Sequence, residues 1–596
     1  MRYQVTGNEY LSLPTIRETD GAIEGVTFLY MRLKGLLEVR GDDALIRPGF
    51  SLDGEKLALH PVWRREHYWI PTFSSKEEGM EYQCVYLAPV GQRAFGLRLT
   101  AKNAGERARS VRVDVSGRWD RTLHEINETA ELPDGREVKE SGWNHMFIWS
   151  QSSGEPLFAM APCIGDSQPF SEIDQGAGWS YDGFAYDIWK ETRLAPGEEV
   201  RLDVFFGIGY EGVAAATSAK ELLRQGFDAL LSDETDWLMT REKRLADRKM
   251  ETILNENLFF ACFFASGRCV DTEEVCLMTS RSPRYYVSAA YWDRDALLWA
   301  FPAILTVDHA YARELLLWVF SRQARNFGVH SRYIDGTVLE PGFELDELCA
   351  PVVALNRYVT ETDDSKILEE PGVRQGLNEI LKRLEAKRDP RSGLYETFLQ
   401  PTDDLRRYPF LTYDNALVWY SLHALSALLG EKELEDKAAD VRRAVYQNCV
   451  IKEKSKSFFI WSTDGKGNYD IYDEPPGSLQ LLPFYGFVAK EDETWRNTVQ
   501  MIRDESYDLS FAGSPIAEIG CRHAPHPWIL SFCNSLLCGH ETEAAKHLGL
   551  TKMDNGVACE SVNERTGECE TGAAFATCAG FLAYALYTAF GADDSD

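Results

Sequence analysis

The chain has 596 residues, 44% of them hydrophobic and 26% charged, which is typical of a globular protein and excludes a disordered or fibrous one. Its formal net charge of −30 argues against binding to nucleic acid or to anionic membranes, because phosphate recognition needs a basic surface. The length exceeds that of one ordinary domain and predicts roughly two to four domains.

Compartment and redox state follow from simple patterns. The N-terminal segment lacks the charged-then-apolar pattern of a secretion signal, and no apolar run reaches the roughly 18 residues that a membrane span needs. The 13 cysteines are odd in number and scattered, which favours reduced, buried thiols over a disulfide framework. We therefore expect a cytoplasmic protein.

The first part of the chain, residues 1–213, reads as β-structure. Short alternating runs such as EYQCVYLAPV (81–90), RSVRVDVSGRW (109–119) and EVRLDVFFGIGY (199–210) are separated by Gly, Pro, Asp and Asn turns. Many short strands without intervening helical patterns predict an antiparallel β-sandwich domain.

The period changes after residue 213. Residues 214–247 are charged and have helical spacing, so we expect a helical linker. Residues 248–596 contain about a dozen further segments with helical spacing. These segments are 251–267, 294–306, 309–325, 344–360, 373–388, 413–429, 432–448, 477–488, 492–504, 526–538, 541–549 and 571–590. Alternating short and long loops predict six hairpins that close into an (α/α)6 toroid. An open solenoid is the alternative, but no fixed repeat period is found.

Two adjacent carboxylates mark the loop before one of these helices. Asp403 and Asp404 follow a proline, and an aromatic-rich run containing Tyr408 leads to Asp414 at the helix start. Acids beside aromatic rings at a loop-to-helix junction suit proton delivery to a ligand that stacks on those rings. Capping or solvation of the helix start is the ordinary alternative for such acids.

Three other loops carry polar groups that suit a sugar site. Trp292, Arg294 and Asp295 stand at a predicted helix start, where the arginine could grip hydroxyl groups; a surface ion pair beside a core tryptophan is the alternative. Glu344 and Asp346 also stand at a helix start, where the helix dipole alone favours acids.

The third of these loops contains Glu560, which precedes the turn NERTGE and the last predicted helix. In a closed toroid the long loops gather at one end, so Glu560 could face the Asp403–Asp404 loop across the mouth. Two opposed carboxylates are what glycoside cleavage requires: one protonates the leaving oxygen and the other activates a water.

Six stretches, in this order, resemble landmarks of glycoside hydrolase family 125, the metal-independent exo-α-mannosidases. They are WDRD (292–295), FELDELCAP (343–351), FLQPTDDLRRYPFL (398–411), DGKGNYDIYDEPPGSLQLLPFYG (464–486), EIGCRHAPHPW (518–528) and CES (559–561). The stretch around the two aspartates resembles the family's Phe-Arg-Pro-Ser-Asp-Asp segment, and CES resembles the segment that carries its base. Together they span about 300 residues of the helical half.

The resemblance implies roles for individual residues. One of Asp403 and Asp404 would be the general acid, with Asp403 favoured, and Glu560 would be the general base. The residues implied to line the subsite for the terminal sugar are Arg294, Asp295, Asp346, Asp473 and His523. The family inverts the anomeric carbon and needs neither metal nor cofactor.

The sequence also departs from the family. Thr402 and Leu405 flank the acid pair, Cys559 replaces a histidine before Glu560, and Arg522 precedes His523. The β half is absent from single-domain members and more resembles the N-terminal sandwiches of other six-hairpin glycosidases. These departures leave the sugar and its linkage open.

These patterns predict an inverting exo-glycosidase that hydrolyses a terminal α-mannoside or α-glucoside from a short oligosaccharide or glycoside. Two alternatives are a glycoside phosphorylase on the same fold, against which the presence of Glu560 argues, and a carbohydrate-binding protein that has lost turnover. The expected partner is a small carbohydrate, with no nucleic acid or membrane partner; self-association through the β half stays open.

Overall fold

A computed structural model describes residues 2–165 and 176–591. The chain divides into two compact units. Unit 1 consists of Met1–Glu242, Ser266–Glu274 and Arg281–Pro283, and unit 2 of Lys243–Ala265, Val275–Ser280 and Arg284–Asp596. The domain boundaries predicted from the sequence stay a prediction.

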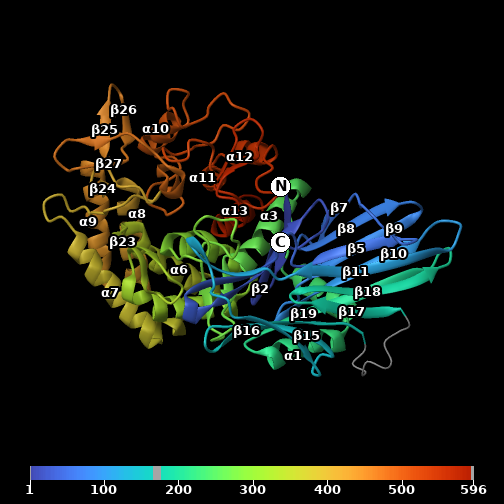
Figure 1. Ribbon diagram of the computed structural model, residues 1–596. Helices are drawn as coiled ribbons and strands as arrows, with labels where there is room; N and C mark the ends of the chain where they lie inside the picture. Colours follow the sequence, from blue (N-terminus) through green and yellow to red (C-terminus); the bar gives the residue numbers. More distant parts are fainter. Residues whose placement is uncertain (1, 166–175, 592–596) are drawn as a thin grey trace. The chain divides into compact units, whose positions relative to one another are not determined.

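Unit 1 consists mainly of antiparallel sheets (Figure 1). One sheet runs in the order β1 (Tyr3–Gly7), β2 (Leu11–Arg17), β3 (Gly25–Tyr30), β4 (Gly35–Arg40), β12 (Arg121–Ile126) and β13 (Glu128–Glu131). A second runs β14 (Arg136–Ser141), β15 (Met146–Ser152), β16 (Pro156–Cys163), β19 (Glu199–Gly209), β10 (Ala94–Asn103), β9 (Met80–Leu87), β8 (Ile70–Glu77) and β7 (Val62–Glu66). A third runs β17 (Ala177–Asp182), β18 (Ala185–Leu194), β11 (Arg109–Arg118), β5 (Arg47–Leu52) and β6 (Glu55–Lys56).

The core of unit 1 lies between these sheets. Phe28, Leu97 and Val113, one from each sheet, belong to the same buried cluster. Because side chains alternate along a strand, one face of each sheet supplies the core. On the pair β10–β19, Phe95 lies opposite Phe206 and their rings stack with centroids 5.2 Å apart. The predicted antiparallel sandwich is confirmed.

Helices α1 (Gly212–Gln225) and α2 (Phe227–Met239) also belong to unit 1 and correspond to the predicted helical segment after the strands. Ala215 and Ala216 of α1 pack on small residues of β16. The backbones approach closely, since a Cβ atom added at Gly207 would lie 2.1 Å from the carbonyl oxygen of Ala215. Only a glycine in the sheet permits this contact.

Glu234 of α2 is a buried acid whose protonation is linked to stability. Its carboxylate accepts a hydrogen bond from the backbone N–H of Val90 at 2.9 Å, and burial raises its pKa to about 8. In the unfolded chain Glu234 ionises above its ordinary pKa of 4.5. In the folded chain it stays protonated up to about pH 8. Stability should therefore fall as the pH rises from 4.5 to 8.

We expect Glu234→Gln to lose less of its melting temperature than the wild type between pH 5 and pH 8, because the amide stays neutral throughout. Differential scanning calorimetry at both pH values measures this. The exposed Glu131 provides the control, and Glu131→Gln should follow the wild type. Parallel curves for wild type and Glu234→Gln would refute the buried neutral acid.

Unit 2 is predominantly helical (Figure 1). Its longer helices are α3 (Arg248–Phe264), α4 (Phe301–Val307), α5 (His309–Trp318), α6 (Leu345–Thr362), α7 (Pro371–Lys387), α8 (Thr412–Leu429), α9 (Lys432–Asn448), α10 (Glu493–Ile502), α11 (Ile529–Leu537), α12 (Glu541–Leu548) and α13 (Ala576–Phe590). Short strands stand in the loops, among them the hairpins β22 (Val329–Arg332) with β23 (Val338–Phe343) and β29 (Ser561–Val562) with β30 (Cys569–Thr571).

From α6 to α9 the helices alternate in burial, and the last three repeat the pattern. Helices α6, α8, α11 and α13 are buried over most of their surface, whereas α7, α9 and α12 bury one face only. A ring of hairpins has this pattern because each hairpin contributes one inner and one outer helix. The predicted order, an antiparallel sandwich followed by an (α/α)6 helical region, is confirmed. Among the described residues, every helix is too short or too polar to span a bilayer.

One predicted helix, 477–488, is wrong. The segment instead contains the 3₁₀ turns η7 (Pro475–Gly477) and η8 (Leu479–Leu481). Pro483 and the left-handed Gly486 prevent a continuous helix despite the apolar spacing between them. The cysteines are reduced thiols, and Cys569 alone among them is only half-buried.

Candidate active site

A pocket in unit 2 collects side chains from several loops. Its wall is rich in aromatic rings, and its polar groups include two carboxylates that the sequence singled out, Asp403 and Glu560. The wall is formed by Thr279, Tyr285, Tyr286, Val287, Trp292, Arg294, Asp295, Trp299, Pro401, Thr402, Asp403, Pro476, His523, Trp528, Glu560 and Phe575. Aromatic walls with a few convergent polar groups are typical of small-molecule sites.

Asp403 stands at the tip of a tight loop. Leu399 and Leu405 pair across its base, and Asp403 has a left-handed backbone with φ of 66°. The buried carboxylate of Glu474 holds the loop from below, accepting hydrogen bonds from the backbone and hydroxyl groups of Thr402, both at 3.0 Å. A strained non-glycine residue held by a buried network is a frequent feature of functional loops.

Arg294 lies beneath Asp403 at the start of the π-helical segment η3 (Arg294–Ala300). Its guanidinium donates to Asp403 at 2.7 Å, to Glu344 at 2.7 Å and to Asp346 at 3.1 Å. Glu347 accepts from the backbone N–H of Arg294 at 3.1 Å and so fixes the start of η3. The arginine and the acids of the α6 terminus are therefore one buried network.

Asp295 also reaches the pocket and is 6% exposed. Burial raises its pKa to about 7, although the neighbouring charge of Arg294 opposes the shift. Thr577 donates a hydrogen bond to it at 3.3 Å. Near neutral pH this group can therefore donate or accept a hydrogen bond toward a ligand hydroxyl.

Glu560 lies on the other carboxyl-bearing loop, just before β29. The hydroxyl of Tyr286 donates to its Oε1 at 2.6 Å, which leaves Oε2 for another partner. Tyr286 is 55% exposed, whereas Glu560 is 4% exposed. The free pocket has a volume of about 60 Å³, well below the cavity of about 150 Å³ that accepts benzene. A sugar ring can enter only if wall residues move, and Tyr286 is the exposed residue among those contacting Glu560.

Gly572 sets the position of Glu560. Its φ is +59°, and a Cβ atom added there would lie 2.5 Å from the Cβ of Glu560. We expect Gly572→Ala to displace Glu560 and to lower kcat/KM of the glycosidase reaction predicted from the sequence. The loss should be about 100-fold, the effect of a misplacement of roughly 1 Å.

Gly430→Ala is the matched control for this substitution. Gly430 has φ of +70° with open space around the added Cβ, so the variant has the backbone strain without the collision. It should lose stability of about 1 kcal/mol and keep its kcat/KM. Equal activity losses in the two variants would contradict a specific role of Gly572 beside Glu560.

The other predicted site residues divide into two groups. Trp292 and His523 line the pocket with Arg294 and Asp295. The predicted residues outside its wall are Glu344, Asp346, Asp404, Tyr408, Asp414 and Asp473. Glu344 and Asp346 contact Arg294, and Asp404 accepts a hydrogen bond from His523 at 3.0 Å. Their roles in binding stay predictions.

Asp414 and Asp473 are buried completely. Burial and the nearby charge of Asp346 raise the pKa of Asp414 well above its ordinary value. Asp473 accepts hydrogen bonds from Ser478 and from the backbone of Leu479, both at 2.7 Å, and burial raises its pKa to about 7. Tyr408 is half-buried and lies beneath the guanidinium of Arg407.

Sequence reasoning missed three residues around the pair of acids: Tyr286, His330 and Glu474. Tyr286 lies six residues before Trp292 of the WDRD stretch, and the adjacent Tyr285 was the available signal. Glu474 lies in a stretch that resembles the family. His330 lies on β22, where no motif pointed to it.

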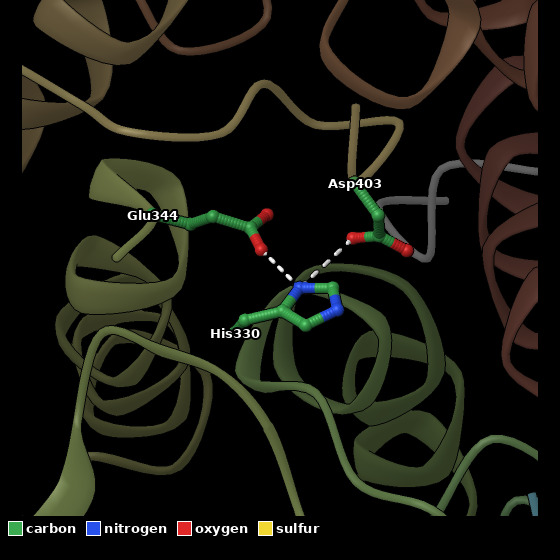
Figure 2. Close-up of side chains that lie close together, drawn as sticks. All are labelled: His330, Glu344 and Asp403. Atoms are coloured by element: carbon green, nitrogen blue, oxygen red, sulfur yellow. Dashed lines mark hydrogen bonds and ion pairs between the residues drawn. The ribbon is translucent and has the colours of Figure 1, made fainter. Parts of the chain in front are cut away.

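His330, Glu344 and Asp403 place one ring nitrogen and two carboxylate oxygens within 4.8 Å of one another (Figure 2). This spacing also suits a metal ion. Arg294, however, donates to both carboxylates and already supplies the positive charge that a cation would provide. We therefore interpret the group as a hydrogen-bond network.

Comparison with known proteins adds to this geometry. Residues 386–586 match the family described as metal-independent alpha-mannosidase (GH125). No curated protein matches the chain. A metal-independent α-mannosidase structure from Streptococcus pneumoniae, in a non-productive complex with α-1,6-mannobiose, has 16% identity and a TM-score of 0.49 over 57% of this chain and 93% of that chain.

Two solved structures align with nearly the whole chain. A bacterial glucoamylase complexed with acarbose has a TM-score of 0.59 and 12% identity, covering 98% of this chain and 93% of that chain. A putative kojibiose phosphorylase from human microbiome has a TM-score of 0.57 and 12% identity, covering 98% of this chain and 86% of that chain. The family match and these folds support a glycoside-active enzyme, hydrolase or phosphorylase. The chain thus has a β-sandwich followed in sequence by the six-hairpin fold and, over residues 386–586, resembles glycoside hydrolase family 125.

Proposed function

We propose that the protein is an inverting exo-glycosidase that removes one terminal α-linked sugar from a short oligosaccharide or glycoside. The observation that carries this proposal is the pocket itself, whose wall holds Asp403 and Glu560 together although they are far apart in the chain. Aromatic rings around the two acids provide faces on which a pyranose can stack.

In the proposed reaction Asp403 protonates the glycosidic oxygen while Glu560 takes a proton from the attacking water. The water adds to the face opposite the leaving group, so an α-glycoside gives a β-sugar. Inversion needs the two carboxyl groups about 6.5–9.5 Å apart, so that the water fits between Glu560 and the sugar. Asp403 is favoured over Asp404 as the acid because Asp403 lines the pocket, whereas Asp404 is engaged by His523.

Several residues would bind the sugar. Arg294 and Asp295 offer donors and an acceptor from one side of the pocket, and Trp292 and Trp299 offer stacking surfaces. Arg294 donates hydrogen bonds to three acids, Glu344, Asp346 and Asp403, and the proposed chemistry uses no metal ion. The pocket must widen to admit even one sugar ring, which favours a single terminal sugar and hence exo-action.

The comparisons support a proposal for the substrate class. The matching family is described as α-mannosidase, and the two whole-chain structural matches are named as a glucoamylase and a kojibiose phosphorylase. We therefore propose an α-mannoside or α-glucoside.

Release of free monosaccharide from α-mannosides and α-glucosides, measured for wild type, Asp403→Asn and Asp404→Asn, tests the proposal. We expect wild-type turnover on one of the two classes and a loss of about 10²–10⁴-fold in Asp403→Asn, the contribution of a positioned acid. Asp404→Asn should lose much less. A folded wild type that releases no sugar from any of them would contradict the proposal.

A further inference from the structure

One oxygen of Asp403, Oδ1, lies close to two basic side chains, Arg294 and His330. Arg294 donates to Oδ1 at 2.7 Å. Nδ1 of His330 lies 3.6 Å from the same Oδ1 and makes a short hydrogen bond to Oε1 of Glu344 (Figure 2). Oε2 of Glu344 in turn accepts a hydrogen bond from Arg294 at 2.7 Å. Arg294, His330 and Glu344 thus form one connected group next to Oδ1 of Asp403.

The two oxygens of Asp403 are therefore not equivalent. Oδ1 can accept the hydrogen bond from the Arg294 guanidinium whether Asp403 is ionised or protonated on Oδ2, because in the protonated acid Oδ1 is a carbonyl oxygen. A proton placed on Oδ1 would compete with the guanidinium donor. Among the described residues none hydrogen-bonds to Oδ2, so a proton on Oδ2 displaces no contact.

We propose that His330 is a positioning residue for the acid: it fixes Glu344 by a hydrogen bond and lies 3.6 Å from Oδ1 of Asp403, the oxygen to which Arg294 donates, so that the transferable proton is carried on Oδ2. The inference rests on the proposed function and deepens it. In the step itself, the Oδ2–H bond breaks, the proton goes to the glycosidic oxygen as the C–O bond of the sugar breaks, and Asp403 is left as a carboxylate. His330 keeps its protons throughout.

The charge of His330 makes this connected group sensitive to pH. Burial alone would lower the pKa of His330, but the hydrogen bond to Glu344 and the charges of Asp403 and Glu344 outweigh burial and raise it. Four charged groups face the ring: Glu344 at the start of α6, Asp403 on its loop, Arg294 on η3, and Glu340 on β23, whose Oε2 lies 3.4 Å from Nε2. The imidazolium is present below the raised pKa and is lost as the pH rises through it.

The test compares two leaving groups in wild type and His330→Asn. Asparagine keeps an N–H group near the position of Nδ1 but carries no charge. On a methyl α-glycoside, whose leaving group needs a proton, we expect kcat to fall by about 10- to 100-fold, part of the effect of a positioned acid. On the matching α-glycosyl fluoride, which leaves with little need of a proton donor, kcat should stay within about threefold of wild type.

The pH profile supplies a second readout that a structural role would not move. Wild-type kcat on the methyl glycoside should fall as the pH rises through the raised pKa of His330, and this alkaline limb should disappear or shift in His330→Asn. Glu340→Gln removes an exposed negative charge that lies beside the His330 ring. The pKa of His330 should then fall, and the alkaline limb should move to lower pH. His423→Asn is the control, because His423 pairs with Glu435 at 2.7 Å on the surface and should leave both readouts unchanged.

The outcomes are separable. Equal losses of His330→Asn on both substrates, with an unchanged profile, would overturn the inference and leave the proposed function standing. A folded wild type that turns over neither substrate would contradict the proposed function, and the inference with it. If His330→Asn fails to fold, an alkaline limb in Glu340→Gln identical to that of wild type is the overturning result.

Discussion

Replacing Glu560 by glutamine is expected to lower kcat by about 10²–10⁴-fold, with the fold intact, because an amide cannot take a proton from the attacking water. The exchange is nearly isosteric, and the amide oxygen can still accept the hydrogen bond that Tyr286 donates at 2.6 Å. The loss should therefore appear in kcat rather than in KM. Steady-state kinetics on the best α-glycoside measures it.

Glu564→Gln is the matched control for this variant. Glu564 lies in the turn between β29 and β30, accepts a hydrogen bond from His526 at 3.3 Å and lies outside the pocket wall, so its amide variant should keep wild-type kcat. Azide offers a further check, since it attacks without a base and should partly restore turnover of Glu560→Gln. More than half of the wild-type kcat in Glu560→Gln would exclude Glu560 as the base.

The second large effect concerns stability. Arg294→Met should lower the free energy of unfolding of the helical unit by about 3–5 kcal/mol, the cost of breaking a buried ion pair by removing one partner. The side chains of Arg294, Glu344 and Asp346 are at most 2% exposed, so both acids would stay buried without the guanidinium that contacts them. Urea unfolding followed by tryptophan fluorescence measures the change.

Arg313→Met separates burial from the mere presence of an ion pair. Arg313 also contacts two carboxylates, Asp364 and Glu370, each at 2.9 Å, but its side chain is 32% exposed. Water screens such a pair, and the variant should lose no more than about 1 kcal/mol. Comparable losses in Arg294→Met and Arg313→Met would show that the buried network contributes nothing special to stability.

Much of the architecture could be predicted from the sequence because the two halves have different hydrophobic periods. Alternation with turn residues marked the strands, and helical spacing marked the ring. The exception is residues 477–488, where apolar spacing suggested a helix but Pro483 and Gly486 act locally against one. Spacing reports which side chains are apolar, not whether the backbone between them can stay helical.

The candidate site could be predicted only in part. Asp403, Glu560 and Arg294 belong to stretches whose composition and resemblance marked them, and all three line the pocket. The same signals marked Asp414 and Asp473, which are buried away from it. Sequence does not tell an acid that faces a ligand from one that supports a loop, because both stand in polar segments near helix starts.

His330 and Gly572 illustrate the remaining gap. His330 reaches Asp403 from a separate hairpin, and Gly572 matters only because its missing Cβ makes room for Glu560. Both depend on contacts between segments distant in sequence. Such contacts follow from the closed ring and from no local pattern.

The measurement that tests the central claim most directly is the anomeric configuration of the first sugar released, followed by proton NMR immediately after mixing enzyme and α-glycoside. Paired action of Asp403 and Glu560 across one pocket predicts the β-anomer first, with the α-anomer appearing only by mutarotation. Initial release of the α-anomer would mean retention and would contradict the assignment of Glu560 as a base acting on water.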